Sequence, residues 1–115
     1  MQLRHFDVTE FDCKHTGENR ISRRFLERID ELRDRCGFPF VITSGYRSPR
    51  HPIEAAKSSP GEHTRGAADI KALSGSQKYT IVRHAIDLGF SGIGVGDSFV
   101  HVDLRDGPQV MWNYT

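Results

Sequence analysis

Two side chains that bind metals and transfer protons stand six positions apart in GEHTRGAADI, residues 61–70. His63 offers an imidazole and Asp69 a carboxylate. A catalytic zinc site takes about three protein ligands from His, Asp and Glu and leaves one position open. A third candidate, His101, lies far along the chain in FVHVDLR, residues 99–105. The three could hold a metal ion or be ordinary polar surface groups, and their spacing alone leaves both interpretations open.

The segment that carries His101 alternates apolar and polar residues, as a half-buried strand does. One side would present Val100, Val102 and Leu104, and the other His101, Asp103 and Arg105. On that polar side Asp103 could orient the imidazole of His101 or pair with Arg105. The pattern predicts a strand whose polar face carries chemistry.

Other chemistries have weaker support in the sequence. A Ser-His-Asp hydrolase is disfavoured because no nucleophile elbow is present. Cys13 and Cys36 could form one disulfide or remain two thiols. Two cysteines do not make a disulfide framework, and Cys36 continues the apolar side of a predicted helix.

The elements that must position these residues are a set of helices and short strands. Ser22 is a good N-cap and Gly37 a stop signal, so helical apolar spacing predicts a helix over 23–35. A second helix opens at Ser76 and ends at Gly89. Strands are expected over 38–43, 67–73 and 99–105. This pattern predicts an α+β domain, a small sheet with helices packed on one side.

The connecting segments are informative as well. Residues 44–62 are rich in Gly, Pro and Ser, and such a long loop in a small domain is usually functional. Residues 89–98 form a glycine-rich connection. The tail from Gly107 carries Trp112 and Tyr114, which we expect to pack back on the body.

Composition restricts the classes of function. The chain has 115 residues, 37% hydrophobic and 27% charged, which predicts one domain over residues 1–115. Its 16 basic and 15 acidic residues nearly balance, so no nucleic-acid partner is expected. The N-terminus lacks the apolar core of a signal peptide, and no run is long enough to span a membrane. We therefore expect synthesis in the cytoplasm. We also expect the protein to be a monomer.

Three motifs in order give the sequence a family resemblance: SGYRSPRHP at 44–52, GEHTRGAADI at 61–70 and GIGVGDSFVHVDLRD at 92–106. Together they resemble the M15 family of zinc D-Ala-D-Ala metallopeptidases, in particular its short peptidoglycan-peptidase branch. The resemblance covers roughly residues 10–106 and implies the fold shared with the hedgehog signalling domain, a hedgehog/DD-peptidase-like fold. Three motifs in the same order are far more specific than any one alone.

The resemblance implies Zn²⁺ as cofactor, held by His63, Asp69 and His101. It also implies that Arg47 lies near the substrate, where its fork of donors suits a peptide carboxylate or an oxyanion. From the sequence alone Arg47 would be a solvated loop residue. Ser44 and Tyr46 are candidates for lining the same cleft, although Tyr46 could equally be a packed aromatic residue.

The sequence departs from the family pattern at two points. The family usually places the Asp seven positions after the first His, and here the spacing is six. Relatives often carry a proton-accepting side chain three positions before the late His, where this chain has Ser98. Asp97 is the nearest carboxylate and our candidate general base, although it could instead cap a turn. Weaker candidates are Glu62, His51 and His84.

The function implied by the resemblance is zinc-dependent hydrolysis of peptidoglycan stem peptides, at D-Ala-D-Ala or at L-Ala-D-Glu. A single domain without a signal peptide suits a phage lysin, a phage structural component or a prophage product that acts on the cell wall. Two alternatives remain. One is a non-catalytic peptidoglycan-binding or phage structural module on a degraded peptidase fold. The other is a domain in which the metal only stabilises the structure.

Overall fold

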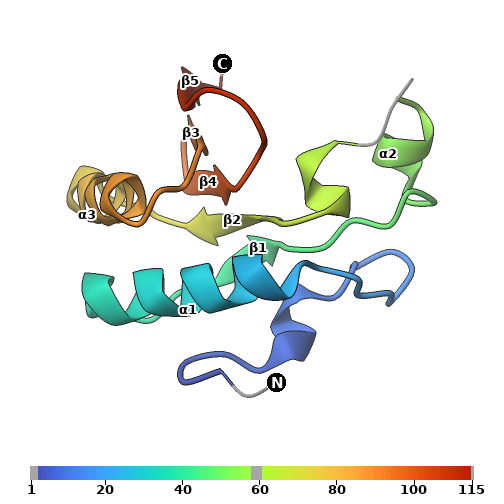
Figure 1. Ribbon diagram of the computed structural model, residues 1–115, viewed down its shortest axis with the longest axis horizontal. Coiled ribbons are helices and arrows are strands. Elements are labelled where there is room, and N and C mark those ends of the chain that lie inside the picture. Colours follow the sequence, from blue (N-terminus) through green and yellow to red (C-terminus); the bar gives the residue numbers. More distant parts are fainter. Residues whose placement is uncertain (1–2, 58–60, 115) are drawn as a thin grey trace.

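The structure is a computed structural model that describes residues 3–57 and 61–114. Its helices are α1 (Arg23–Cys36), α2 (Pro52–Ala55) and α3 (Gly75–Asp87), with short 3-10 turns η1 (Val8–Phe11) and η2 (Glu62–Thr64). Its strands are β1 (Ile42–Ser44), β2 (Ala67–Lys71), β3 (Gly92–Val95), β4 (Phe99–Asp103) and β5 (Val110–Asn113). Figure 1 shows α1 along one side of the sheet and α2 near one end of it.

The five strands form one sheet in the order β1-β2-β4-β3-β5. Neighbours are antiparallel except for β5, which pairs with β3 in parallel. After β4 the chain reverses through Gly107, whose positive φ of 97° favours glycine, and passes beyond β3 before it forms β5. The predicted α+β class with helices on one side is confirmed, and the sheet is mixed. The arrangement is consistent with the hedgehog/DD-peptidase-like fold.

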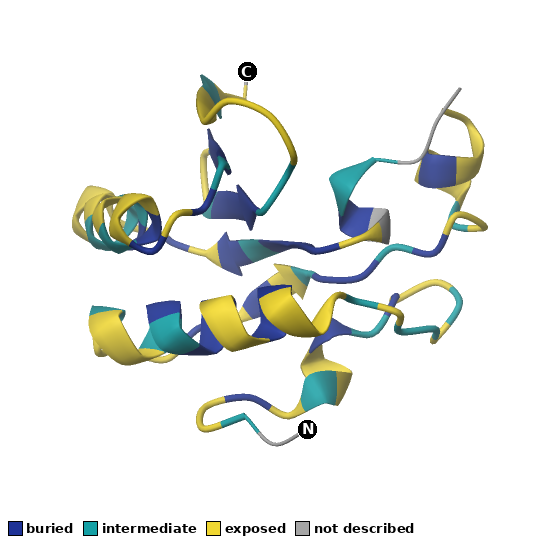
Figure 2. Ribbon diagram, in the orientation of Figure 1, coloured by how far each residue is buried: buried dark blue, intermediate teal, exposed yellow. Residues whose placement is uncertain are grey.

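The two longer helices cover one face of the sheet. Apolar side chains of α1 and α3 pack with Ile70 of β2, Val100 and Val102 of β4 and Ile93 of β3 in one buried core. Figure 2 shows the buried central strands and the exposed outer side of α1. Because side chains alternate along a strand, the residues between these core positions project from the opposite face. That opposite face carries Asp69 and His101, which are paired directly across β2 and β4.

The ends of the helices follow from local chemistry. The Ser22 hydroxyl accepts from Phe25 N, and Gly37 ends α1 in the left-handed conformation at φ 75°. The predicted helix over 23–35 is thus confirmed within one residue. The second helix begins earlier than predicted, because the hydroxyl of Ser74, rather than that of Ser76, caps it by accepting from Gln77 N.

Four predictions about strands and connections need correction. The strand predicted over 38–43 is shorter and later, Ile42–Ser44. The glycine-rich connection at 89–98 contains strand β3. Its glycines lie on one face of the sheet, and Ile93 packs in the core on the other face. The strands predicted over 67–73 and 99–105 end at Lys71 and Asp103.

The loop and the tail also hold regular structure. The segment predicted as loop over 44–62 holds α2 and the start of η2, and its residues 58–60 lie outside the described residues. The tail packs back as predicted, as strand β5. Both cysteines are free: Cys13 is buried, and Cys36 is partly buried against the core. No helix among residues 3–57 and 61–114 is both long and apolar enough to cross a membrane.

Candidate metal centre

The structure brings His63, Asp69 and His101 together on the sheet face that the helices leave open. One potential ligand atom from each residue lies within 4.8 Å of the others. Oδ1 of Asp69 is 3.4 Å from Nε2 of His63 and 2.9 Å from Nδ1 of His101. Both imidazoles are buried, whereas the Asp69 side chain keeps 17% of its surface exposed. The three residues therefore form a compact, partly accessible donor set of two nitrogens and one oxygen.

His63 is oriented by the loop that follows β1. Its Nδ1 lies 2.7 Å from the carbonyl oxygen of Gly45, so the Nδ1–H donates to that oxygen and Nε2 is left facing Asp69. The backbone at Gly45 can lie close to the backbone of Phe11 because glycine has no side chain. A Cβ there would lie 2.7 Å from Cα of Phe11, in the segment that also accepts a hydrogen bond from Tyr46 N. A tight backbone crossing thus fixes the histidine.

His101 is oriented by the strand that carries it. Its Nε2 donates to Oδ2 of Asp103 at 2.7 Å, two residues along the same face of β4. Asp103 is itself fully buried and held by Arg105, whose Nε and Nη2 donate to its two oxygens at 3.0 and 2.7 Å. A carboxylate on the far nitrogen of a metal-binding histidine is a common arrangement, because it fixes the ring and the tautomer. Two alternative roles were predicted for Asp103, orienting His101 or pairing with Arg105, and Asp103 makes both contacts.

The electrostatics of this cluster favour a bound cation. Burial alone would raise the pKa of Asp69, but hydrogen bonds from His101 and His63 hold it well below its usual range. Burial also works against ionised Asp103, yet bonds from His101 and Arg105 lower its pKa strongly. For His101 burial favours the neutral form, but Asp103 and Asp69 outweigh it and raise its pKa. The two carboxylates therefore stabilise positive charge between them, either a proton on His101 or a metal ion.

The donor set fits a metal ion on chemical grounds. Each histidine has one ring nitrogen bonded to an acceptor, Gly45 O or Asp103 Oδ2, and the other nitrogen turned toward Asp69. In neutral imidazoles those inward nitrogens carry lone pairs. Two lone pairs and a carboxylate oxygen converging on one point repel unless a cation lies among them. His63, Asp69 and His101 could thus hold a metal ion with N, O and N ligation.

The shortened spacing between His63 and Asp69 is compatible with this geometry. His63 lies in the 3-10 turn η2, where Arg65 N and Gly66 N both donate to Glu62 O, and β2 begins at the next residue. Gly66 packs closely on α1, since a Cβ there would lie 2.9 Å from Cβ of Phe25. The compact turn followed by a straight strand brings both side chains to one site, six residues apart.

The comparison with known families agrees with this site. A family model described as Peptidase M15 matches residues 4–103, most of the chain. The chain belongs to the Peptidase M15 family. Its members are metal-dependent peptidases, so the family and the His-Asp-His cluster agree on a peptidase with a metal centre. No curated protein matched the sequence. The match includes all three cluster residues and ends before β5.

The residues expected to contact substrate lie together beside the cluster. Ser44, Tyr46 and Arg47 line one small pocket, with Lys14 and His51 among the other residues around it. Arg47 N donates to the carbonyl oxygen of His63, which couples this loop to the metal centre. Tyr46 is almost fully buried, so little of its side chain is available to a ligand.

The Arg47 guanidinium is held by a residue that the sequence did not reveal. Its Nη1 donates to Oε2 of Glu54 at 2.9 Å, and its Nη2 lies 3.4 Å from Ser44 Oγ. The Glu54 side chain is fully buried and also accepts from Lys57 Nζ and Gly61 N. Burial would raise the pKa of Glu54, and these bonds lower it instead. The sequence pointed to Glu54 only through the length of the loop 44–62, because so long a loop in a small domain is usually functional.

Asp97 is not among the residues whose ligand atoms converge in the described cluster. Asp97 is exposed in the turn between β3 and β4, and its backbone carbonyl accepts from Lys78 Nζ of α3. His101 is two residues inside β4, about 7 Å along the strand from its first residue. The weaker candidates are engaged elsewhere. His51 accepts from Ile53 N, Glu62 accepts from Arg65, and His84 lies on α3.

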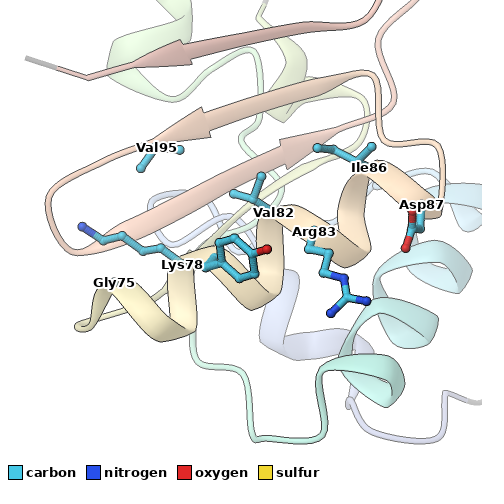
Figure 3. Close-up of a pocket in the computed structure, with 8 residues that line it drawn as sticks. Gly75, Lys78, Val82, Arg83, Ile86, Asp87 and Val95 are labelled. Carbon is cyan, nitrogen blue, oxygen red and sulfur yellow. The ribbon is translucent and has the colours of Figure 1, made fainter.

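An open apolar groove lies elsewhere on the molecule. Tyr79, Val82 and Ile86 of α3 and Val95 of β3 line an open apolar surface, flanked by Lys78 and Arg83 (Figure 3). Val95 belongs to the helix-covered face of the sheet, so this groove and the metal centre are on opposite faces. The candidate site is therefore located by the converging ligands and not by this groove.

Proposed function

We propose that this chain is a zinc-dependent peptidase that hydrolyses the stem peptides of peptidoglycan. One observation carries the proposal: the inward nitrogens of His63 and His101 converge with Oδ1 of Asp69, while their outer nitrogens are bonded to Gly45 and Asp103. Three N and O ligands with no fourth protein ligand in the described cluster are typical of a catalytic zinc site rather than a closed structural one.

Each residue of the centre has a separate task in this proposal. Bound zinc would supply a Lewis acid for the scissile carbonyl and make water nucleophilic near neutral pH. His63, Asp69 and His101 bind the ion. Asp103 keeps the proton of His101 on Nε2, so that Nδ1 is free to ligate. The dense hydrogen bonding around both histidines holds the ligand atoms in place before the ion arrives.

Arg47 would bind the substrate on the side of the loop. Glu54 and Ser44 hold its guanidinium in the pocket that Tyr46 also lines. From there it could donate to a peptide carboxylate or to the developing oxyanion, because its planar fork matches either group. The two candidate bonds are D-Ala-D-Ala and L-Ala-D-Glu. In both, alanine is the residue on the N-terminal side of the scissile bond. The proposed setting is the bacterial cell wall, with the protein as a phage or prophage product.

The test begins with metal content. Purified wild-type protein and the variant His101→Ala are supplied with zinc, freed of excess by gel filtration and measured by elemental analysis. We expect about one zinc per chain in the wild type and a clear loss in the variant. Digestion of purified muropeptides followed by mass spectrometry then identifies the bond that is cleaved.

Two results would point to the alternatives. Wild-type protein that retains no zinc would favour the non-catalytic peptidoglycan-binding or phage structural module. Protein that retains zinc but leaves every muropeptide intact would indicate a metal that only stabilises the fold. Circular dichroism of the His101→Ala variant controls for unfolding.

A further inference from the structure

Strand β3 presents only glycine to the face that holds the metal centre. Gly92 is paired with Asp103 and Gly94 with His101 across the β3–β4 ladder. The intervening Ile93 points into the core. A Cβ built on Gly94 would lie 2.6 Å from Nε1 of Trp112 and 2.6 Å from Cε2 of Tyr114. The strand thus adds no side chain of its own to this face. The side chains of Trp112 in β5 and of Tyr114 just after β5 lie over Gly94 instead.

The side chains of Trp112 and Tyr114, together with that of Phe99 in β4, form an aromatic row beside the metal centre. Trp112 is paired with Gly94, and its ring centroid lies 5.3 Å from that of His101. The ring centroid of Tyr114 lies 6.1 Å from that of Trp112, edge to face, and 4.9 Å from that of Phe99, with the rings tilted. We call Phe99, Trp112 and Tyr114 the aromatic row. It extends the pair of histidine rings, whose centroids are 5.0 Å apart, toward the edge of the sheet.

The row carries large rings at the surface rather than in the core. Tyr114 keeps 45% of its surface exposed, and Trp112 is half-buried. Exposed rings beside a metal centre offer apolar area and polar tips to a ligand.

The charges around the aromatic row indicate which part of a substrate could bind there. Arg105 lies over the Trp112 ring at 4.7 Å, but its guanidinium is bonded to both oxygens of Asp103. The positive charge on this side is therefore neutralised within the protein. The loop on the other side keeps a net positive charge, because the single carboxylate of Glu54 is shared by Arg47 and Lys57. Lys14 lines the same pocket as Arg47. An uncharged residue suits the row, and an anionic group suits the loop.

Resting on the proposed function, we propose that Trp112 and Tyr114 form the substrate-binding surface for the uncharged residue on the N-terminal side of the scissile bond. That residue is alanine in both candidate bonds, and its methyl group and peptide plane would pack on the rings. These residues stand at 112 and 114, beyond the family match, which ends at 103. The row thus adds a specificity determinant to the metal centre of the family.

The experiment uses the disaccharide pentapeptide GlcNAc-MurNAc-L-Ala-D-Glu-(diaminopimelate)-D-Ala-D-Ala, which contains both candidate bonds. Zinc content, kcat and KM are measured for wild type, Trp112→Ala and Tyr114→Ala. Met111→Ala is the matched control, because Met111 is on the same strand, is 52% exposed and points to the opposite face. We expect full zinc content, a KM raised about tenfold in Trp112→Ala and several-fold in Tyr114→Ala, and an unchanged control.

A second measurement does not depend on turnover. Trp112 is the sole tryptophan of the chain, so intrinsic emission reports on the row directly. Stopped-flow mixing of zinc-loaded protein with the pentapeptide is followed in the presence of acrylamide. We expect the bound peptide to reduce acrylamide quenching about twofold in the wild type and in Met111→Ala.

The outcomes separate the two proposals. A KM within twofold of wild type in zinc-loaded Tyr114→Ala, with no protection of Trp112 from acrylamide, overturns the substrate-binding role of the row. If Trp112→Ala loses zinc, Tyr114→Ala decides, because Tyr114 is not in ring contact with either histidine among the described contacts. Protein that binds no zinc and cleaves nothing overturns the proposed function, while protection of Trp112 by the pentapeptide still supports the row.

Discussion

The carboxylate of Asp103 should control zinc affinity although it is not placed among the ligands. It is fully buried and accepts from His101 Nε2, from Arg105 Nε and Nη2, and from Arg105 N. An asparagine has one acceptor oxygen and an NH₂ group, so Asp103→Asn must turn that NH₂ toward either His101 or Arg105. The imidazole then loses the negative charge that fixes its tautomer. We expect zinc affinity to fall about 10- to 100-fold, or about 1.4–2.7 kcal/mol.

Competition with a chromophoric chelator measures this loss. The matched control is Asp106→Asn, which removes the same charge from an exposed position on the same segment. We expect the control to bind zinc as the wild type does, and the far-ultraviolet circular dichroism of both variants to be unchanged. An Asp103→Asn protein that binds zinc within about threefold of wild type would refute the reasoning, since His101 would then need no partner on its outer nitrogen.

Three further predictions follow from the structure. Gly45→Ala should lower the free energy of unfolding by about 1–3 kcal/mol in urea titrations, because its Cβ would overlap the backbone of Phe11; unchanged stability would contradict the tight crossing. Asp97→Asn should keep kcat within about threefold of wild type, since Asp97 is exposed in a turn away from the cluster, and a loss of a hundredfold or more would restore it as the general base. Chelator-treated protein should lose stability at both ends of the pH range. The raised pKa of His101 contributes stability that is fully present below its unfolded pKa of about 6.5 and lost as pH rises through the folded value. The lowered pKa of Asp69 contributes stability that is present above about 3.9 and lost as pH falls. Urea titrations across pH 3–9 check both limbs, and zinc should abolish the alkaline one.

Much of the fold could be predicted from local patterns. Ser22 and Gly37 marked the ends of α1, and the alternation around His101 identified the core side and the polar side of β4. These predictions held because capping and side-chain alternation depend on neighbours a few residues away. The strand β3 was missed, because its glycines are typical of a loop and the sequence does not show the neighbouring strands β4 and β5.

The candidate site was predicted in part. His63, Asp69 and His101 came from residue types, spacing and family resemblance, and the structure brings them within reach of one ion. Asp97 was chosen as the carboxylate nearest to the position, three before His101, where relatives often carry the base, and it is exposed in the β3–β4 turn. Two residues that are close in sequence, such as Asp97 and His101, need not be close in space, because an extended chain advances by about 3.4 Å per residue.

Residue chemistry and short periods were enough to predict the ligand types, the helix caps and the two-faced strand that carries His101. The surroundings of these residues depend on the tertiary fold. Gly45 reaches His63, Glu54 reaches Arg47, and Trp112 reaches His101 by crossing a strand of glycines. Such contacts depend on how distant segments pack against one another, and no local pattern encodes that packing.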